Sequence, residues 1–206
     1  MGVEDGTRAL QSSTKKRDLW ETRHSWPGGG NPVVGIDVSV LMMASLGSNK
    51  SLEGWFMAPP VPVTPVAKYV QDYCQLLKAY KFDPVLVFDG ARNPLKSATT
   101  SKRYQNLPAD RGKLEAMYSD PATTMPQIVK QQRESISIRE DTQAEVLSMA
   151  PREEIPVVGS PFGADSQLIA LMVQGVIDYV LTVDSDLPSQ GAFRTICKLS
   201  RANRTV

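Results

Sequence analysis

Long hydrophobic runs are missing from this sequence. No stretch approaches the roughly 20 apolar residues that a membrane-spanning helix needs. The first residues, Met1 to Thr14, also lack the apolar core of a secretory signal peptide. We therefore expect an intracellular protein that does not associate with a membrane.

Metal-binding thiols and imidazoles are scarce too. Cys74 and Cys197 stand alone, fit no zinc or redox spacing, and are expected to be reduced thiols in the core. The single histidine, His24, lies in a Gly/Pro-rich neighbourhood and is expected at the surface. This scarcity excludes a zinc site built from histidines.

The hydrophobic residues that are present, 41% of 206, form short runs rich in valine and isoleucine. Such runs are typical of buried parallel strands, and the segments between them have helical spacing. The pattern predicts an α/β fold with a doubly wound, mainly parallel sheet, as a single domain over residues 1–206. The runs are Val33 to Asp37, Pro84 to Asp89, Ile155 to Gly159 and Tyr179 to Asp186, with a possible fifth strand from Phe193 to Cys197.

Aspartates end or closely follow these runs. Because ligands bind beyond the carboxyl ends of the strands in an open α/β sheet, the acids are expected to converge on one crevice. Carboxylates packed together repel one another, so the cluster is expected to hold a hard cation. The residues concerned are Asp37, Asp89, Asp165, Asp184 and Asp186.

Each acid also has a purely structural explanation. Asp184 and Asp186, two apart in an extended segment, would point the same way, but this segment could also be a turn or a helix cap. Asp37 could cap the next helix, as could Ser39. Asp89 could belong to a turn with Gly90. Asp165 could simply be favoured by the helix dipole, because it lies in the first turn of its helix. The occurrence of all these acids in one topology favours a metal site over a set of separate structural roles.

The charge distribution points to a phosphate-rich partner. Residues 92–139 carry nine Lys/Arg and four Asp/Glu (+5), residues 140–189 one Arg and nine acids (−8), and residues 190–206 four basic residues (+4). A metal-binding acidic region flanked by basic surface suits an enzyme that acts on phosphate groups. The alternative is solvated helix faces.

The chain also contains two unusual segments. Residues 1–31 are polar and end in a Gly-rich stretch that predicts a flexible connector. Residues 91–139, the arch segment, are basic and interrupted by prolines at 94, 108, 121 and 126, which indicates a functional excursion. Within it, Lys96, Lys102 and Arg103 could bind the scissile phosphate, or belong to a solvated basic helix.

These motifs, in this order, resemble the flap endonuclease/XPG family of 5′ nucleases, which includes exonuclease 1. The resemblance spans about residues 33–190, and the 52 residues from Asp37 to Asp89 and 19 from Asp165 to Asp184 suit the family. The motifs are Gly35-Ile36-Asp37-Val38-Ser39, Phe88-Asp89-Gly90, Pro94-Leu95-Lys96 with Arg103, Ser160-Pro161-Phe162-Gly163-Ala164-Asp165, and Leu181-Thr182-Val183-Asp184-Ser185-Asp186-Leu187.

The resemblance implies a PIN-like nuclease domain that cleaves DNA near a 5′ end or flap. The five aspartates would hold two Mg²⁺ ions, with Mn²⁺ as a substitute. Lys96 and Arg103 would be catalytic at the base of a helical arch, and Gly2 and Lys102 would join them at the DNA. A monomer located in the nucleus is expected on the same basis.

The sequence also departs from the family. Gly163 stands where the family has a metal-binding acid, and Gly6 is offset by one residue from the expected glycine. The sequence has no counterpart of the helix-two-turn-helix element that follows in the family. Two alternatives to a DNA nuclease therefore stay open: a degenerate nuclease fold that binds nucleic acid or acts as a scaffold, and an RNA-directed PIN-type nuclease.

Overall fold

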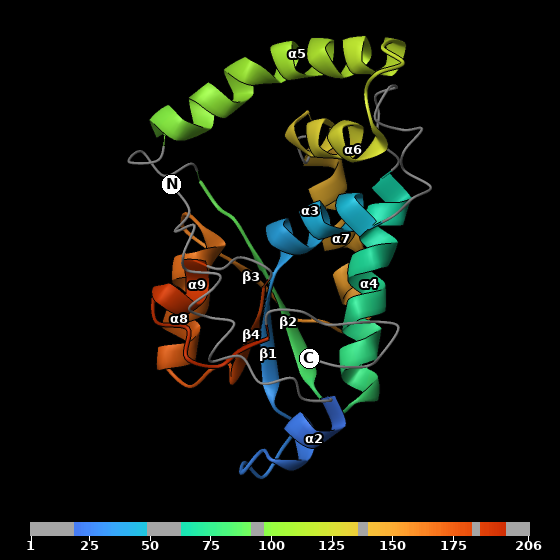
Figure 1. Ribbon diagram of the computed structural model, residues 1–206. Coiled ribbons are helices and arrows are strands. Elements are labelled where there is room, and N and C mark those ends of the chain that lie inside the picture. Colours follow the sequence, from blue (N-terminus) through green and yellow to red (C-terminus); the bar gives the residue numbers. More distant parts are fainter. Residues whose placement is uncertain (1–18, 49–62, 92–96, 136–139, 183–185, 197–206) are drawn as a thin grey trace.

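Five parallel strands form one sheet in the computed structural model, which describes residues 19–48, 63–91, 97–135, 140–182 and 186–196 (Figure 1). The predicted α/β sheet is confirmed, with strand boundaries that differ by a few residues from the sequence runs. The strands are β1 (Val33–Asp37), β2 (Asp83–Phe88), β3 (Val157–Gly159), β4 (Tyr179–Leu181) and β5 (Thr195–Ile196).

The strand order is β3-β2-β1-β4-β5, with every neighbouring pair parallel. The chain moves outward from β1 to β3, then returns to the other side of β1 with β4. Ligands of doubly wound sheets bind where the order reverses, just beyond the carboxyl ends of the strands. In this sheet that position lies between β1, which ends at Asp37, and β4.

Helices cover both faces of the sheet. Figure 1 shows α3 (Val38–Ser48), α4 (Val63–Ala79) and α7 (Glu140–Arg152) on one side and α8 (Ala164–Val173) with α9 (Asp186–Ser189) on the other. The two layers bury separate hydrophobic clusters.

Successive side chains of a strand point to opposite faces of the sheet, so alternate residues belong to the two clusters. Leu86 and Phe88 belong to the cluster on the α4 side, and Val87 belongs to the cluster on the α8 side. On β1, a Cβ atom at Gly35 would lie 2.6 Å from Ile177 Cδ1 and 2.7 Å from a methyl carbon of Leu168. The missing side chain lets α8 approach β1 closely.

The helical stripe from Val66 to Tyr80 is core, as its spacing predicts. Val66, Val70, Cys74 and Leu77 are at most 2% exposed. Cys74 is a free, buried thiol, as expected, whereas Cys197 lies outside the described residues.

The arch segment forms two helices, α5 (Ser97–Ser119) and α6 (Met125–Glu134). The expected interruption at Pro108 is wrong, because Pro108 lies inside α5, which is 23 residues long. Proline removes one helical hydrogen bond and bends a helix without necessarily ending it. Figure 1 shows α5 bending along its length and lying across the end of the molecule where the strands finish.

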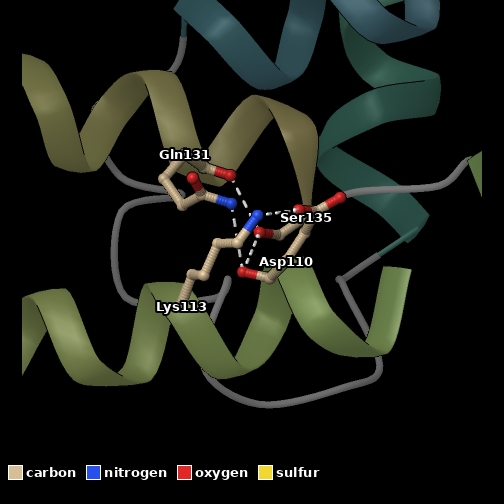
Figure 2. A network of polar contacts seen from close by, with 4 residues as sticks. All are labelled: Asp110, Lys113, Gln131 and Ser135. Atoms are coloured by element: carbon tan, nitrogen blue, oxygen red, sulfur yellow. Dashed lines mark hydrogen bonds and ion pairs between the residues drawn. The ribbon is translucent and has the colours of Figure 1, made fainter. Parts of the chain in front are cut away.

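Packing against α6 holds the second half of α5 in place. Leu114 of α5 and Ile128 of α6 are buried. Figure 2 shows the polar part of this contact: the main-chain carbonyl of Asp110 accepts hydrogen bonds from Gln131 Nε2 (3.1 Å) and Ser135 Oγ (3.0 Å). Tertiary contacts of this kind compensate for the hydrogen bond that Pro108 cannot make.

The polar segment before β1 is more ordered than predicted. Residues Leu19–His24 form the helix α2, and Leu19 is fully buried in the core. Trp26 packs on Tyr179 with ring centroids 5.8 Å apart and lies 5.3 Å from the guanidinium of Arg194. This helix lies within the segment 1–31 that the sequence analysis described only as polar.

None of the described helices combines the length and the apolar character needed to cross a bilayer.

Candidate active site

Asp37 and Asp89 lie at the same edge of the sheet. Asp37 is the last residue of β1, and Asp89 follows β2, the strand paired with it in parallel. A hydrogen bond joins the two neighbourhoods, because Ser39 Oγ donates to Asp89 Oδ2 at 2.5 Å. Two of the predicted acids therefore share one neighbourhood.

Asp37 also caps a helix. Its Oδ1 accepts the backbone N–H of Val40 at 3.0 Å, in the first turn of α3, and its exposed fraction is 3%. The structural explanation considered for Asp37 is thus correct, and it does not exclude a ligand role, since a carboxylate oxygen can accept more than one contact. Ser39 is not the cap, because its hydroxyl donates to Asp89.

Asp89 connects the same edge to α8. Its Oδ1 accepts the backbone N–H of Ala164 at 2.7 Å, at the first residue of that helix. Asp165, the next residue, lies in the first turn of α8, as predicted. Asp89 thus contacts Ser39, two residues after Asp37, and Ala164, the residue before Asp165. In this sense Asp37, Asp89 and Asp165 form a linked set of aspartates.

The loop after β3 lies directly on the Asp89-Gly90 corner. The N–H of Gly90 donates to the carbonyl of Phe162 (2.6 Å), and the N–H of Ala91 donates to the carbonyl of Pro161 (3.0 Å). A Cβ atom at Gly90 would lie 1.8 Å from the carbonyl oxygen of Ser160. Glycine is therefore required here by the close approach of two backbones.

Ser160 fastens this loop from within. Its hydroxyl accepts the N–H of Gly90 at 3.1 Å and lies within hydrogen-bonding distance of the carbonyls of Phe88 (2.8 Å) and Phe162 (2.6 Å). The roles of Ser39 and Ser160 were missed from the sequence, since a lone serine carries no distinctive spacing. Both serines belong to the motifs that resemble the family, and this membership was the signal that the sequence offered.

Other predicted site residues fall partly or wholly outside the described structure. Gly2, Lys96 and Asp184 lie outside the described residues. Lys102 and Arg103 belong to α5, where the structure describes only their backbone. Asp186 is the first residue of α9, and β4 already ends at Leu181. The expectation that an extended strand continues to Asp186 is therefore wrong.

Gly163 is the N-cap of α8 and supplies no side-chain cap to this helix. Asp89 makes the hydrogen bond to Ala164 instead. A Cβ atom at Gly163 would lie 4.0 Å from Asp89 Oδ1, and its backbone has φ −75° and ψ 142°, which any residue adopts. The position can therefore accept a side chain next to Asp89, although the sequence places none there.

The donor set suits a hard cation in its chemistry, since carboxylate oxygens are the ligands that Mg²⁺ prefers. Asp89 retains acceptor capacity toward the described residues, because each of its oxygens has two lone pairs and accepts one hydrogen bond from them. Within the described residues, no three His, Cys, Asp or Glu side chains form a group that could hold a metal ion. Asp37, Asp89 and Asp165 therefore do not form such a group by themselves.

Known proteins resemble this chain in both sequence and fold. Residues 26–108 match the family described as the XPG N-terminal domain. The resemblance to the flap endonuclease/XPG family is confirmed. Exodeoxyribonuclease 1 of Saccharomyces cerevisiae is 29% identical to this chain over 141 residues, 66% of the chain and 20% of the relative. Exonuclease 1 of Oryza sativa subsp. japonica is 25% identical over 146 residues, 71% of the chain and 17% of the relative.

Solved structures share the XPG-type fold. The catalytic core of Rad2 in complex with a DNA substrate has a TM-score of 0.66 at 18% identity and is matched by all of this chain over 53% of its own length. Human GEN1 in complex with Holliday junction DNA has a TM-score of 0.58 at 18% identity, with 93% of this chain and 39% of GEN1 covered. These likenesses support the PIN-like 5′-nuclease fold.

The chain spans about a fifth of the length of these two curated relatives and about half of the Rad2 chain. The similarity thus concerns the α/β domain that carries Asp37 and Asp89.

Proposed function

We propose that this chain is a divalent-metal-dependent nuclease that hydrolyses DNA phosphodiester bonds, of the flap endonuclease or 5′–3′ exonuclease type. The observation that carries the proposal is the linked set of Asp37, Asp89 and Asp165 at the carboxyl edge of an XPG-type sheet. The relatives named exonuclease 1, and a GEN1 structure described as containing product DNA and Mg²⁺, support the same reaction class.

In this proposal, Asp37, Asp89, Asp165, Asp184 and Asp186 hold two Mg²⁺ ions. When bound, such ions lower the pKa of a water molecule and neutralise charge on the phosphate. The protein's own part is to fix the carboxylates. Ser39 and the N–H of Ala164 each hold one oxygen of Asp89, so its carboxylate plane is oriented before any ligand arrives.

The arch segment would supply the positive charge in the same proposal. Lys96 and Arg103 would contact the reacting phosphate, and Gly2 and Lys102 would contact the DNA nearby. Figure 1 shows the backbone of α5 lying across the carboxyl end of the sheet, which would bring a basic helix over the acidic edge. Cations placed there would stabilise negative charge that develops on the phosphate.

The direct test is incubation of the protein with a labelled 5′-flap DNA and Mg²⁺. Asp37→Asn is the informative variant, because asparagine caps a helix as well as aspartate does and so removes the charge while keeping the hydrogen bond to Val40. We expect cleavage by the wild type and a loss of at least about 100-fold in the variant, in the range seen when a group acting on the transition state is removed. Equal product from both proteins would refute the proposal.

A second candidate, a degenerate nuclease fold that binds nucleic acid without cleaving it, is favoured by one observation. Gly163 leaves the position beside Asp89 without the acid that the family carries. We would compare Gly163→Glu with the neutral, equally large Gly163→Gln, reading both cleavage and the shift of the melting temperature on adding Mg²⁺. A gain with glutamate alone supports a decayed site, whereas full wild-type activity rejects it.

The proposal also covers the extent of the domain, the oligomeric state, the substrate and the location in the cell. We propose a single nuclease domain over residues 1–206, a monomer that acts on 5′-flap or single-strand-containing DNA, and a nuclear location. RNA is the alternative substrate. Parallel reactions with DNA and RNA flaps of one sequence, and Mg²⁺ compared with Mn²⁺, separate these possibilities.

A further inference from the structure

The loop that contacts the Asp89-Gly90 corner carries an exposed aromatic side chain. Phe162 is 48% exposed and is absent from both described hydrophobic clusters. Its position is two residues before the start of α8 and three before Asp165. Packing in the core therefore does not account for this ring.

The backbone that carries Phe162 is firmly held. Its carbonyl accepts the N–H of Gly90, and the hydroxyl of Ser160 lies 2.6 Å from the same oxygen. The next carbonyl upstream, that of Pro161, accepts the N–H of Ala91. An exposed ring on a pinned backbone loses little conformational entropy on binding a ligand, which is the property of an aromatic anchor.

Charge at this position favours an uncharged contact. The acids at this end of the sheet, Asp37, Asp89 and Asp165, repel the phosphate backbone in the absence of cations. A nucleobase, by contrast, is neutral and stacks on an aromatic ring with a contribution that does not depend on this repulsion.

We propose that Phe162 is a substrate-positioning residue on which a nucleobase of the bound DNA stacks next to the Asp89-Gly90 corner. This inference rests on the proposed function, because it takes the ligand to be DNA. Stacking there fixes the register of the strand relative to Asp89, so the ring determines which phosphodiester bond is presented to the acids.

The test uses 5′-flap DNA carrying 2-aminopurine at successive positions around the junction, in EDTA so that no cleavage occurs. We expect wild-type protein to quench the fluorescence at one position. Phe162→Leu, which keeps an apolar side chain of similar size, should abolish that quenching and weaken binding by about fivefold or more, whereas Phe162→Trp should restore both.

Phe193→Ala provides the matched control. Phe193 is 65% exposed but lies at the start of β5, at the opposite end of the sheet from the aspartates. Its replacement should leave the quenching unchanged. Melting temperatures of all variants are measured alongside, and the Leu and Trp variants should match the wild type.

The outcomes separate this inference from the proposed function. Tight DNA binding with identical quenching by wild type and Phe162→Leu overturns the stacking role and leaves the nuclease proposal intact. Absence of DNA binding by the wild type both in EDTA and with Mg²⁺ overturns both. A cleavage pattern that shifts by one or more nucleotides in Phe162→Leu with Mg²⁺, but stays fixed in Phe193→Ala, supports the register role.

Discussion

At the scale of single residues, Asp37 and Asp89, which are proposed to bind metal ions, also have structural roles. Asp37 caps α3, and Asp89 accepts the first N–H of α8 across 75 positions of sequence. Neither partner of Asp89 could be predicted, because a contact between residues that far apart leaves no local pattern. The acids themselves could be predicted, since each follows a recognisable strand.

Gly90 and Gly163 offer a matched pair of substitutions. Alanine at Gly90 would bring a Cβ atom to 1.8 Å from the carbonyl of Ser160, so the two loops would have to separate. We expect Gly90→Ala to lower the free energy of unfolding by about 2–4 kcal/mol, in the range of severe steric substitutions. Gly163→Ala meets nothing closer than 4.0 Å and should change it by less than about 0.5 kcal/mol.

Urea denaturation followed by circular dichroism measures both variants. Similar stability of Gly90→Ala and the wild type would show that the Ser160 loop is not held against this corner in solution.

Burial raises the pKa of the Cys74 thiol to about 12, with the nearby Lys78 opposing this shift. Because the thiolate is the reactive species, Cys74 should be inert to iodoacetamide at pH 8 in the folded protein. The measurement uses Cys197→Ser, so that Cys74 is the one thiol left in the chain. Mass spectrometry should find no adduct under native conditions and one adduct in urea. Rapid native labelling would contradict the burial of this stripe of α4.

At the scale of elements, the parts with strong local patterns could be predicted and the parts governed by tertiary contacts could not. β1 and β2 were predicted because β-branched runs end in aspartate, and α4 because its apolar stripe is continuous. The continuity of α5 through Pro108 was missed, since packing of Leu114 and the Asp110 carbonyl on α6 outweighs the local effect of proline. The helix α2 was missed because six residues are too short for a periodic signal.

The junction between α7 and β3 is fastened to α4 by Glu153. Its carboxylate accepts hydrogen bonds from the amides of Gln71 and Gln75, and Lys78 Nζ donates to its main-chain carbonyl. The hydrogen bond from Gln71, followed by that from Gln75, lowers the pKa of Glu153 below its ordinary value of 4.5. The glutamate at this junction is therefore favoured in its charged form.

A lowered folded-state pKa means that the charged form stabilises the fold. This contribution is fully present above the unfolded-state value near 4.5 and is lost as the pH falls through the lower folded-state value. Glu153→Gln should therefore be less stable than the wild type at pH 7, and the difference should shrink toward pH 3. Thermal unfolding of both proteins across this range is the measurement. A difference that stays constant with pH would show that the carboxylate charge does not contribute.

At the scale of the whole molecule, the basic helices and the acidic edge lie on the same side. The segment 92–139 carries a net charge of +5 and contains α5 and α6, and α5 crosses the end of the sheet where the aspartates lie (Figure 1). A phosphate backbone would be attracted by the helices and repelled by the edge until cations bind there. DNA affinity should therefore fall with monovalent salt.

Two lysines in equivalent local settings test where that attraction arises. Lys113 of α5 pairs with Asp110 at 3.2 Å, and Lys68 of α4 pairs with Asp72 at 3.5 Å, with lysine side chains 66% and 68% exposed. Exposed pairs of this kind contribute little to stability, so both lysines can be replaced by glutamine without unfolding the protein. If DNA lies under α5, Lys113→Gln should weaken binding and reduce the slope of log K against log salt by about 1, whereas Lys68→Gln should change neither. Fluorescence anisotropy of a labelled flap DNA over a series of KCl concentrations gives both quantities. Equal slopes for the two variants would place the DNA elsewhere, because the variants differ mainly in the helix that presents the charge.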